Sequence, residues 1–188
     1  MSDTPKRKRG RERERPGPYR WAVQVFFLAI VLSAALSLAS ETSLSGAGAA
    51  AAALVLAVFI GLGILFDIIG VAVTAADPRP FHSMAAHKEK GAKAAIRLLQ
   101  NANQVSSVCN DVVGDICGIV SGSTAAVIVT HLQRDLSTTS VLISIGATAL
   151  ISGITIGGKA LGKTVAINQC TSVVYRVARI MHALHLSR

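Results

Sequence analysis

The sequence predicts an all-helical integral membrane protein with about four transmembrane helices and no extramembrane domain of any size. Of its 188 residues 51% are hydrophobic and only 15% are charged, and the mean hydropathy is +0.51. This is more apolar than a water-soluble domain of this length usually is. The apolar residues also fall in long blocks, and a helix needs roughly 20 such residues to cross a hydrocarbon core.

Charged residues lie beside the apolar blocks, in three patches. The net charge of +9 would suit nucleic acid, but membrane topology explains this placement more simply. The expected partner is therefore the lipid bilayer, and no nucleic-acid partner is expected.

Residues 1–20 form a basic arm, in which eight residues are Lys or Arg. Pro16 and Pro18 disfavour a helix, so we predict a disordered segment. We interpret it as the orientation signal for a first span at residues 21–39, with attraction to anionic lipid or nucleic acid as the alternative. Residues 37–39 have the small-x-small form of a signal-peptide cleavage site, but the long apolar stretch favours an uncleaved span.

The rest of the chain, residues 49–188, is predicted to hold three more spans, at residues 49–75, 106–130 and 140–166. The polar segment at 76–105 is predicted to be an amphipathic juxtamembrane hairpin, with Gly91 between two short helices. A tail helix is expected within residues 168–188. The apolar residues predicted to share one helical face are Ala92, Ala95, Ile96 and Leu99 in the hairpin, and Val173, Val177, Ile180, Met181 and Leu184 in the tail.

Basic residues are distributed asymmetrically between the connections. The arm holds eight, the 76–105 segment five and the region after Gly158 five, whereas the two opposite connections hold none and one. Because basic segments stay on the cytoplasmic side, we predict a multi-pass protein of the cell membrane with both termini in the cytoplasm.

Six polar residues fall within or at the edges of the spans: Asp67, Asn110, Asp111, Asp115, Lys159 and Lys163. A charge in hydrocarbon costs several kcal/mol unless it is paired, hydrated or neutralised, so such residues mark functional sites. The four at 67, 110, 111 and 115 are candidate cation ligands, and the two lysines are candidate charge partners. Pairing of Asp67 or Asp115 with Lys159, which would only hold the bundle together, is the alternative.

Glycines recur at four-residue steps in two spans. Gly114, Gly118 and Gly122 follow Asn110, while Gly153 and Gly157 form one pair and Gly158 and Gly162 a second pair. Such spacing lets helix backbones approach closely, so we interpret these residues as helix-packing seams of the bundle or of a homodimer. On this basis Gly118→Leu is expected to disrupt assembly.

No pattern indicates catalysis. Cys109, Cys117 and Cys170 lack metal-ligand spacing and suit apolar packing, and the pair His182 and His185 lacks a third ligand nearby. No phosphate-binding loop or Ser–His–acid order is present, so we do not expect an enzyme.

From Ala49 onward the chain resembles the transmembrane domain of the CNNM/CorC magnesium transporters. The segment FDIIGVAVTAADP stands where that family has a Ser-Gly-Ser-Glu-Thr-Ala-Leu-like motif, and KGAKAAIRLLQNANQVSSV resembles its juxtamembrane hairpin. VCNDVVG keeps the Asn of the family's Gly-Asn pair at Asn110. TIGGKALGKTVA matches the family's Gly-Glu-x-x-Pro-Lys motif at Gly158 and Lys163.

The resemblance implies Mg²⁺ as the ion, with Asp67 and Asn110 as its ligands. Several family residues are replaced, however: the Glu of the first motif by Gly70, the Glu of the last motif by Lys159 and its Pro by Gly162. Asp67 would restore a carboxylate about one helical turn from the lost one. This sequence does not include the pair of CBS domains with which the family senses nucleotides. Nucleotide gating would therefore need a separate cytoplasmic regulatory protein.

The sequence thus leads to two hypotheses of different classes. The first is a CNNM/CorC-like homodimer involved in divalent-cation transport or homeostasis, with Mg²⁺ as the ion. The alternative is a non-transporting membrane scaffold that binds lipid or a cytoplasmic partner.

Overall fold

The computed structural model describes residues 18–44, 48–135 and 141–184, and in these ranges every regular element is helical. In chain order the elements are α1 (Pro18–Leu44), α2 (Ala49–Ala75), α3 (Arg79–Ala86), α4 (Ala92–Gln100), α5 (Ala102–Ser107), the π-helix η1 (Val108–Gly114), α6 (Asp115–Asp135), α7 (Val141–Asn168) and α8 (Cys170–Ala183).

Four helical segments are long and apolar enough to cross a membrane, as predicted, and they fit a multi-pass membrane protein: Tyr19–Thr42, Ala49–Ala75, Ala102–Asp135 and Val141–Asn168. The second has the predicted bounds of 49–75. The first continues past the predicted end at residue 39, because Ser40 and Glu41 lower the hydropathy without interrupting helical hydrogen bonding. The third combines α5, η1 and α6 in one rod.

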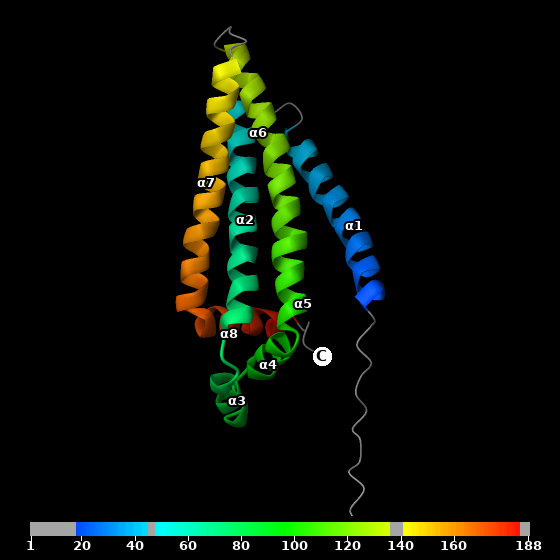
Figure 1. Ribbon diagram of the computed structural model, residues 1–188, viewed down its shortest axis with the longest axis vertical. Coiled ribbons are helices and arrows are strands. Elements are labelled where there is room, and N and C mark those ends of the chain that lie inside the picture. The colour runs from blue at the N-terminus through cyan, green and yellow to red at the C-terminus, as the bar shows by residue number, and fades with distance from the viewer. Residues whose placement is uncertain (1–17, 45–47, 136–140, 185–188) are drawn as a thin grey trace, which may run out of the picture.

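Helix α2 is the centre of the bundle (Figure 1). It contacts η1 and α6 on one side and α7 on the other, while α1 packs outside against α6. Gly158 and Gly162 allow α7 to lie close to α2, since a Cβ atom at these positions would be 2.5 Å from Ile64 Cδ1 and 2.9 Å from Ile68 Cγ1. This pair is therefore a packing seam, as predicted.

The remaining short helices gather at one end of the bundle, which we call the hairpin end. Helix α8 lies across the base of the spans, with α3 and α4 beyond it (Figure 1). Gly91 has φ +91°, and a Cβ atom there would be 3.1 Å from Arg179 Cα. Only glycine tolerates both the left-handed backbone and this approach to α8 without strain.

The buried faces of α4 and α8 extend beyond the predicted ones. On α4 the predicted Ala92 and Ala95 are fully buried, and Ala94 and Leu98 are buried as well; on α8 the deepest residues are Val174 and Ala178, whereas the predicted Leu184 is 64% exposed. The reason is that the two helices pack against each other and against α2, a tertiary contact that the apolar pattern of each helix alone does not contain. Whether α3, α4 and α8 lie along a membrane surface stays a prediction.

The start of α1, the helices α3 and α4, and α8 all lie at the hairpin end (Figure 1). This common end fits the predicted grouping of the arm, hairpin and tail, most of the arm being outside the described residues. The opposite end, where α6 ends and α7 begins, we call the loop end. Which end faces the cytoplasm stays a prediction.

Candidate functional site

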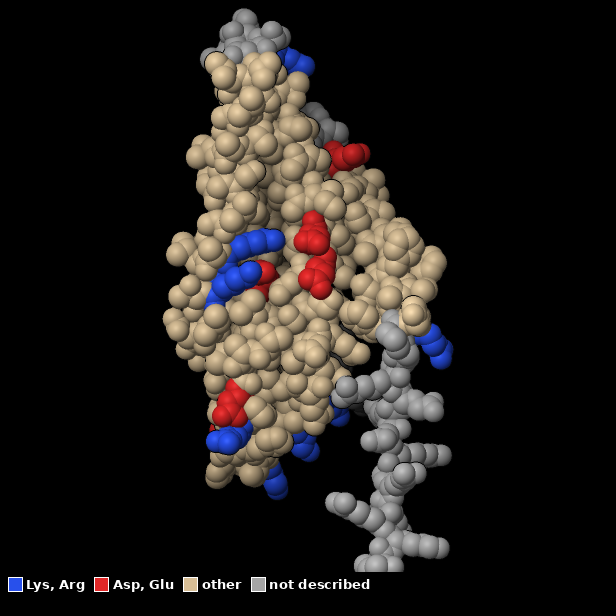
Figure 2. All heavy atoms as spheres, in the orientation of Figure 1, with Lys and Arg blue, Asp and Glu red and all other residues tan. Residues whose placement is uncertain are grey.

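The six predicted polar residues come from three of the spans. Asp67 lies on α2, Asn110 and Asp111 on η1, Asp115 on α6, and Lys159 and Lys163 on α7. Figure 2 shows acidic and basic side chains facing one another across a hollow between α7 and the η1–α6 rod, about midway along the bundle. We refer to these six residues as the polar cluster.

The π-helix η1 is the local structure that positions Asn110. A Cβ atom at Gly70 of α2 would be 2.8 Å from Asn110 Cγ and 3.1 Å from its Nδ2, so the carboxamide occupies the space that a side chain at Gly70 would fill. Short π-helical segments are rare and are often found at functional sites. Gly70 stands where the similar motif of the CNNM/CorC transporters has Glu. Because Gly70 has no side chain, it leaves room for the Asn110 carboxamide.

Sequence reasoning did not predict this π-helix. The ladder of Asn110, Gly114, Gly118 and Gly122 assumed uninterrupted α-helical periodicity, and the wider turn changes which residues share a face. Gly114 is buried, whereas Gly118 and Gly122 are exposed. No periodic signal in VCNDVVG marks the change.

Two buried oxygen atoms at the interface of α2 and η1 have no hydrogen-bond donor in the described chain. They are Asp67 Oδ2, on a residue that is only 7% exposed, and Asn110 Oδ1. The Asn110 amide nitrogen donates to Ser106 Oγ at 3.3 Å, so its carbonyl oxygen is the free group. Asp67 precedes Gly70 by about one helical turn on α2, so its side chain starts close to the α2 face on which the Asn110 carboxamide lies. A buried carboxylate oxygen without a donor is costly, which favours a water or a ligand beside it.

The two lysines approach the cluster from α7. Lys159 Nζ lies 3.9 Å from the position that a Cβ atom at Gly114 would take, so this side chain reaches the η1–α6 rod. Within residues 18–44, 48–135 and 141–184, neither Lys159 nor Lys163 forms an ion pair with an acidic residue. The suggested pairing of Asp67 or Asp115 with Lys159 is therefore not formed.

The other two acidic residues are placed differently from Asp67. Asp111 and Asp115 are both exposed, and Asp111 Oδ2 accepts a hydrogen bond from Ser107 Oγ at 2.7 Å. In the part of the chain that the structure describes, no group of three or more His, Cys, Asp or Glu side chains is arranged to hold a metal ion. The acidic residues thus do not form a carboxylate cage, and the buried acceptors are Asp67 and Asn110.

Most of the predicted packing glycines have no neighbouring helix. A Cβ atom at Gly118, Gly122, Gly153 or Gly157 would meet no atom within 4 Å in the described chain, and one at Gly114 would make only ordinary contacts. Close approaches occur elsewhere, for example at Gly63, where a Cβ atom would be 3.3 Å from Cys117 Cβ. The interpretation of these five residues as a packing seam therefore does not hold within one chain. Packing against a second chain in a homodimer stays a prediction.

No family model, curated protein or solved structure matches this chain. The resemblance to the CNNM/CorC transporters accordingly rests on the four sequence motifs alone.

Proposed function

We propose that the chain binds a divalent cation, Mg²⁺ in the first place, between α2 and η1, and that this site serves divalent-cation transport or homeostasis. The observation that carries the proposal is the pair of buried acceptors, Asp67 Oδ2 and Asn110 Oδ1, which lack a donor in the described residues. Hard cations take oxygen ligands from carboxylates, amides, backbone carbonyls and water. Both acceptors are of this kind.

The charges around the site favour weak binding. The polar cluster holds three acidic and two basic residues, which gives a formal charge of −1, and only Asp67 among the acids is buried. Mg²⁺ would therefore be only partly neutralised and would keep several of its waters. A transport site must bind strongly enough to be entered and weakly enough to be left. We therefore expect an affinity in the millimolar range, with the lysines favouring release.

Under the scaffold hypothesis the same residues stabilise the folded bundle and bind no ion. A nearly neutral cluster needs no ion, provided that Asp67 is stabilised by Lys159 in the folded bundle. In the described chain Asp67 and Lys159 do not form an ion pair, so this stabilisation of Asp67 is not seen there. This favours the cation site as the function to test first.

The test is thermal unfolding of the detergent-solubilised protein with and without Mg²⁺. A ligand at about ten times its Kd stabilises the folded state by about 1.4 kcal/mol, so the wild type should melt at a higher temperature in Mg²⁺. Asp67→Asn should abolish most of this shift without lowering the melting temperature in the absence of Mg²⁺. Asp115→Asn is the matched control, since it removes an exposed acid of the same cluster, and it should keep most of the shift.

The scaffold gives the opposite pattern. If Lys159 stabilises Asp67, then Asp67→Asn should lower the melting temperature without Mg²⁺, and Lys159→Met should recover much of the loss. A wild type that shows no shift at about ten times the expected millimolar Kd for Mg²⁺ would contradict the cation proposal.

A further inference from the structure

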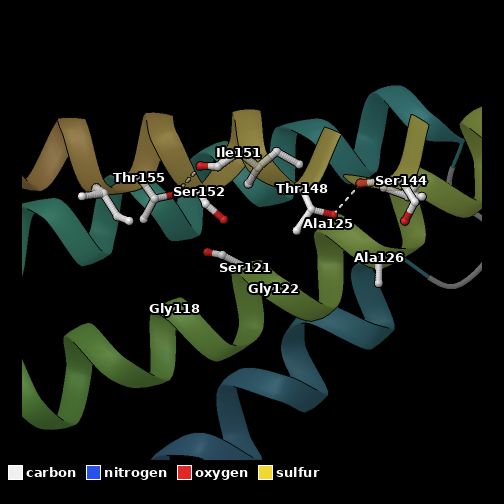
Figure 3. Close-up of a pocket in the computed structure, with 12 residues that line it drawn as sticks. Gly118, Ser121, Gly122, Ala125, Ala126, Ser144, Thr148, Ile151, Ser152 and Thr155 are labelled. Atoms are coloured by element: carbon white, nitrogen blue, oxygen red, sulfur yellow. Dashed lines mark hydrogen bonds between the residues drawn. The ribbon is translucent and has the colours of Figure 1, made fainter. Parts of the chain in front are cut away.

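A groove runs between α6 and α7 in the half of the bundle nearer the loop end. Its volume is about 410 Å³. Small and hydroxyl-bearing residues make up most of its lining, and Figure 3 shows these side chains projecting into the space between the two helices. The groove is lined by Gly118, Ser121, Gly122, Ala125, Ala126, Val129, Ser144, Thr148, Ile151, Ser152, Thr155 and Ile156.

One hydroxyl in this groove lacks the partner that a dry environment would require. Ser121 is 96% buried, being 4% exposed, and its Oγ has no hydrogen-bond partner in the described residues. Ser152 extends toward it from α7 (Figure 3). By contrast, Thr148 and Thr155 donate to the carbonyl oxygens of Ser144 and Ile151, each at 2.8 Å. The Oγ atom of Ser121 is covered in the described chain and would stay unsatisfied in hydrocarbon, whereas a water admitted beside it by a small movement of the groove walls would satisfy it.

The groove adjoins the polar cluster. Its inner end is formed by Gly118 of α6 and by Thr155 and Ile156 of α7. About one helical turn further along the same two helices lie Asp115 and Lys159. Figure 2 shows the crevice between the two helices reaching the charged side chains. Water in the groove would thus be continuous with the hydration of the cluster.

We propose that this groove is a water-filled vestibule that connects the loop end of the bundle with the polar cluster. Its volume of about 410 Å³ would hold about a dozen waters, at roughly 30 Å³ each. The absence of side chains at Gly118 and Gly122 keeps the α6 wall open. That a hydrated cation enters by this path rests on the function proposed above, but the presence of water does not.

Thiol accessibility tests the vestibule. Ser152→Cys places a thiol in the groove, and Ile154→Cys places one on the same helix at a residue that is 57% exposed and does not line the groove. Both are introduced with Cys109, Cys117 and Cys170 changed to alanine, or with the native cysteines retained if that background does not fold. The probe is a charged, membrane-impermeant methanethiosulfonate, applied to both faces of the reconstituted membrane.

We expect Ser152→Cys to react at least ten times faster than Ile154→Cys, because the charged reagent reaches thiols only through water. Adding Gly122→Leu should slow the reaction at residue 152 about tenfold by filling the groove nearer the loop end, while leaving residue 154 unchanged. Equal and slow reaction at both positions would mean that a lipid chain fills the groove. Formation of a disulfide-linked dimer by Ser152→Cys, in place of labelling, would mean that a second copy covers it. Either result overturns the vestibule.

Labelling requires no Mg²⁺. A dry groove would therefore leave the thermal-shift result for Asp67 intact, and a protein that does not bind Mg²⁺ could still be labelled at residue 152. The two proposals fail separately.

Discussion

The hairpin half of the bundle and its loop half contain glycines at the same spacing in opposite surroundings. In the hairpin half α2 lies between α7 and the η1–α6 rod, and glycines lie against Ile64, Ile68 and Asn110. In the loop half α6 and α7 face each other across a groove, and the glycines there have no atom within 4 Å of a Cβ position. The close set is Gly70, Gly158 and Gly162, and the open set in the groove is Gly118 and Gly122. Gly153 and Gly157 are also open, but they lie on another face of α7 and do not line the groove.

This contrast shows that a four-residue glycine repeat indicates a smooth helix face but not what covers it. Whether another helix lies there depends on which way that face points: Gly158 and Gly162 of α7 face α2, whereas Gly153 and Gly157 of the same helix face no described residue. The same repeat therefore serves close packing in one half and, in our proposal, a hydrated space in the other. Substitutions that add a side chain distinguish the two uses.

The largest effect is expected at Gly70. Gly70→Val would place a branched side chain in the space of the Asn110 carboxamide, so α2 and η1 would have to separate. Overpacking of this kind costs about 1–3 kcal/mol and occasionally more, and we expect the upper end of the range. Thermal unfolding in detergent measures the loss.

Two further variants make this prediction specific. Gly61→Val is the matched control on the same helix, because a Cβ atom at Gly61 meets nothing within 4 Å. Asn110→Ala combined with Gly70→Val should recover part of the stability, because it removes the carboxamide that the valine side chain would contact. Equal melting temperatures for the Gly61 and Gly70 variants would show that η1 does not lie against α2.

Hydropathy alone predicted much of the fold. The block from 49 to 75 is long, apolar and bounded by Gly48 and by Pro78, so the span that it predicts agrees with α2 at both ends. The first span was predicted too short, because hydropathy decreases at Ser40 whereas the helix continues to Leu44. The burial of Val174 on α8 could not be predicted, since it depends on the packing of α4 against α8.

The candidate site was predicted in its residues but not in its geometry. Charges in apolar blocks identify Asp67, Lys159 and Lys163 at once, because hydrocarbon tolerates few of them. The sequence did not reveal that Asp67 is buried whereas Asp111 and Asp115 are exposed, because burial depends on how α2, η1 and α6 pack together. The groove forms because α6 and α7 are separated, and the sequence pattern of one helix does not predict its distance from another.

A smaller effect is expected where α7 approaches α2. Gly162→Val would bring its Cβ atom to 2.9 Å from Ile68 Cγ1, but an isoleucine side chain can shift more easily than a backbone. We expect a loss of about 1–2 kcal/mol in thermal unfolding, and recovery of part of it by Ile68→Ala.

Gly157→Val is the matched control for Gly162→Val, since the space at Gly157 is open within the chain. Its stability should change by no more than about 0.5 kcal/mol, as for exposed sites in general. If Gly157→Val instead converts a dimer to a monomer in light scattering, the open glycines pack against a second copy. If Gly162→Val and Gly157→Val are equally stable, the difference between the covered and the open glycine face of α7 is incorrect.

The smallest effect concerns α1, which lies outside the contrast between the two halves. Besides its apolar contacts with α2, η1 and α6, it makes one buried polar contact with α6. Ser40 Oγ lies 3.3 Å from Thr124 Oγ1, and Thr124 Oγ1 also donates to the carbonyl oxygen of Val120 at 2.8 Å. Because a hydroxyl has one proton, Ser40 is the donor between the two. Hydrogen bonds between transmembrane helices contribute about 0.6 kcal/mol on average, so the double-mutant cycle of Ser40→Ala and Thr124→Val should give a coupling free energy of about that size. The cycle must be accompanied by the mass of the purified protein, since cleavage after residue 39 would leave Ser40 at the chain terminus and remove α1. A coupling near zero in a chain whose mass is intact would show that the hydrogen bond between Ser40 and Thr124 is not formed.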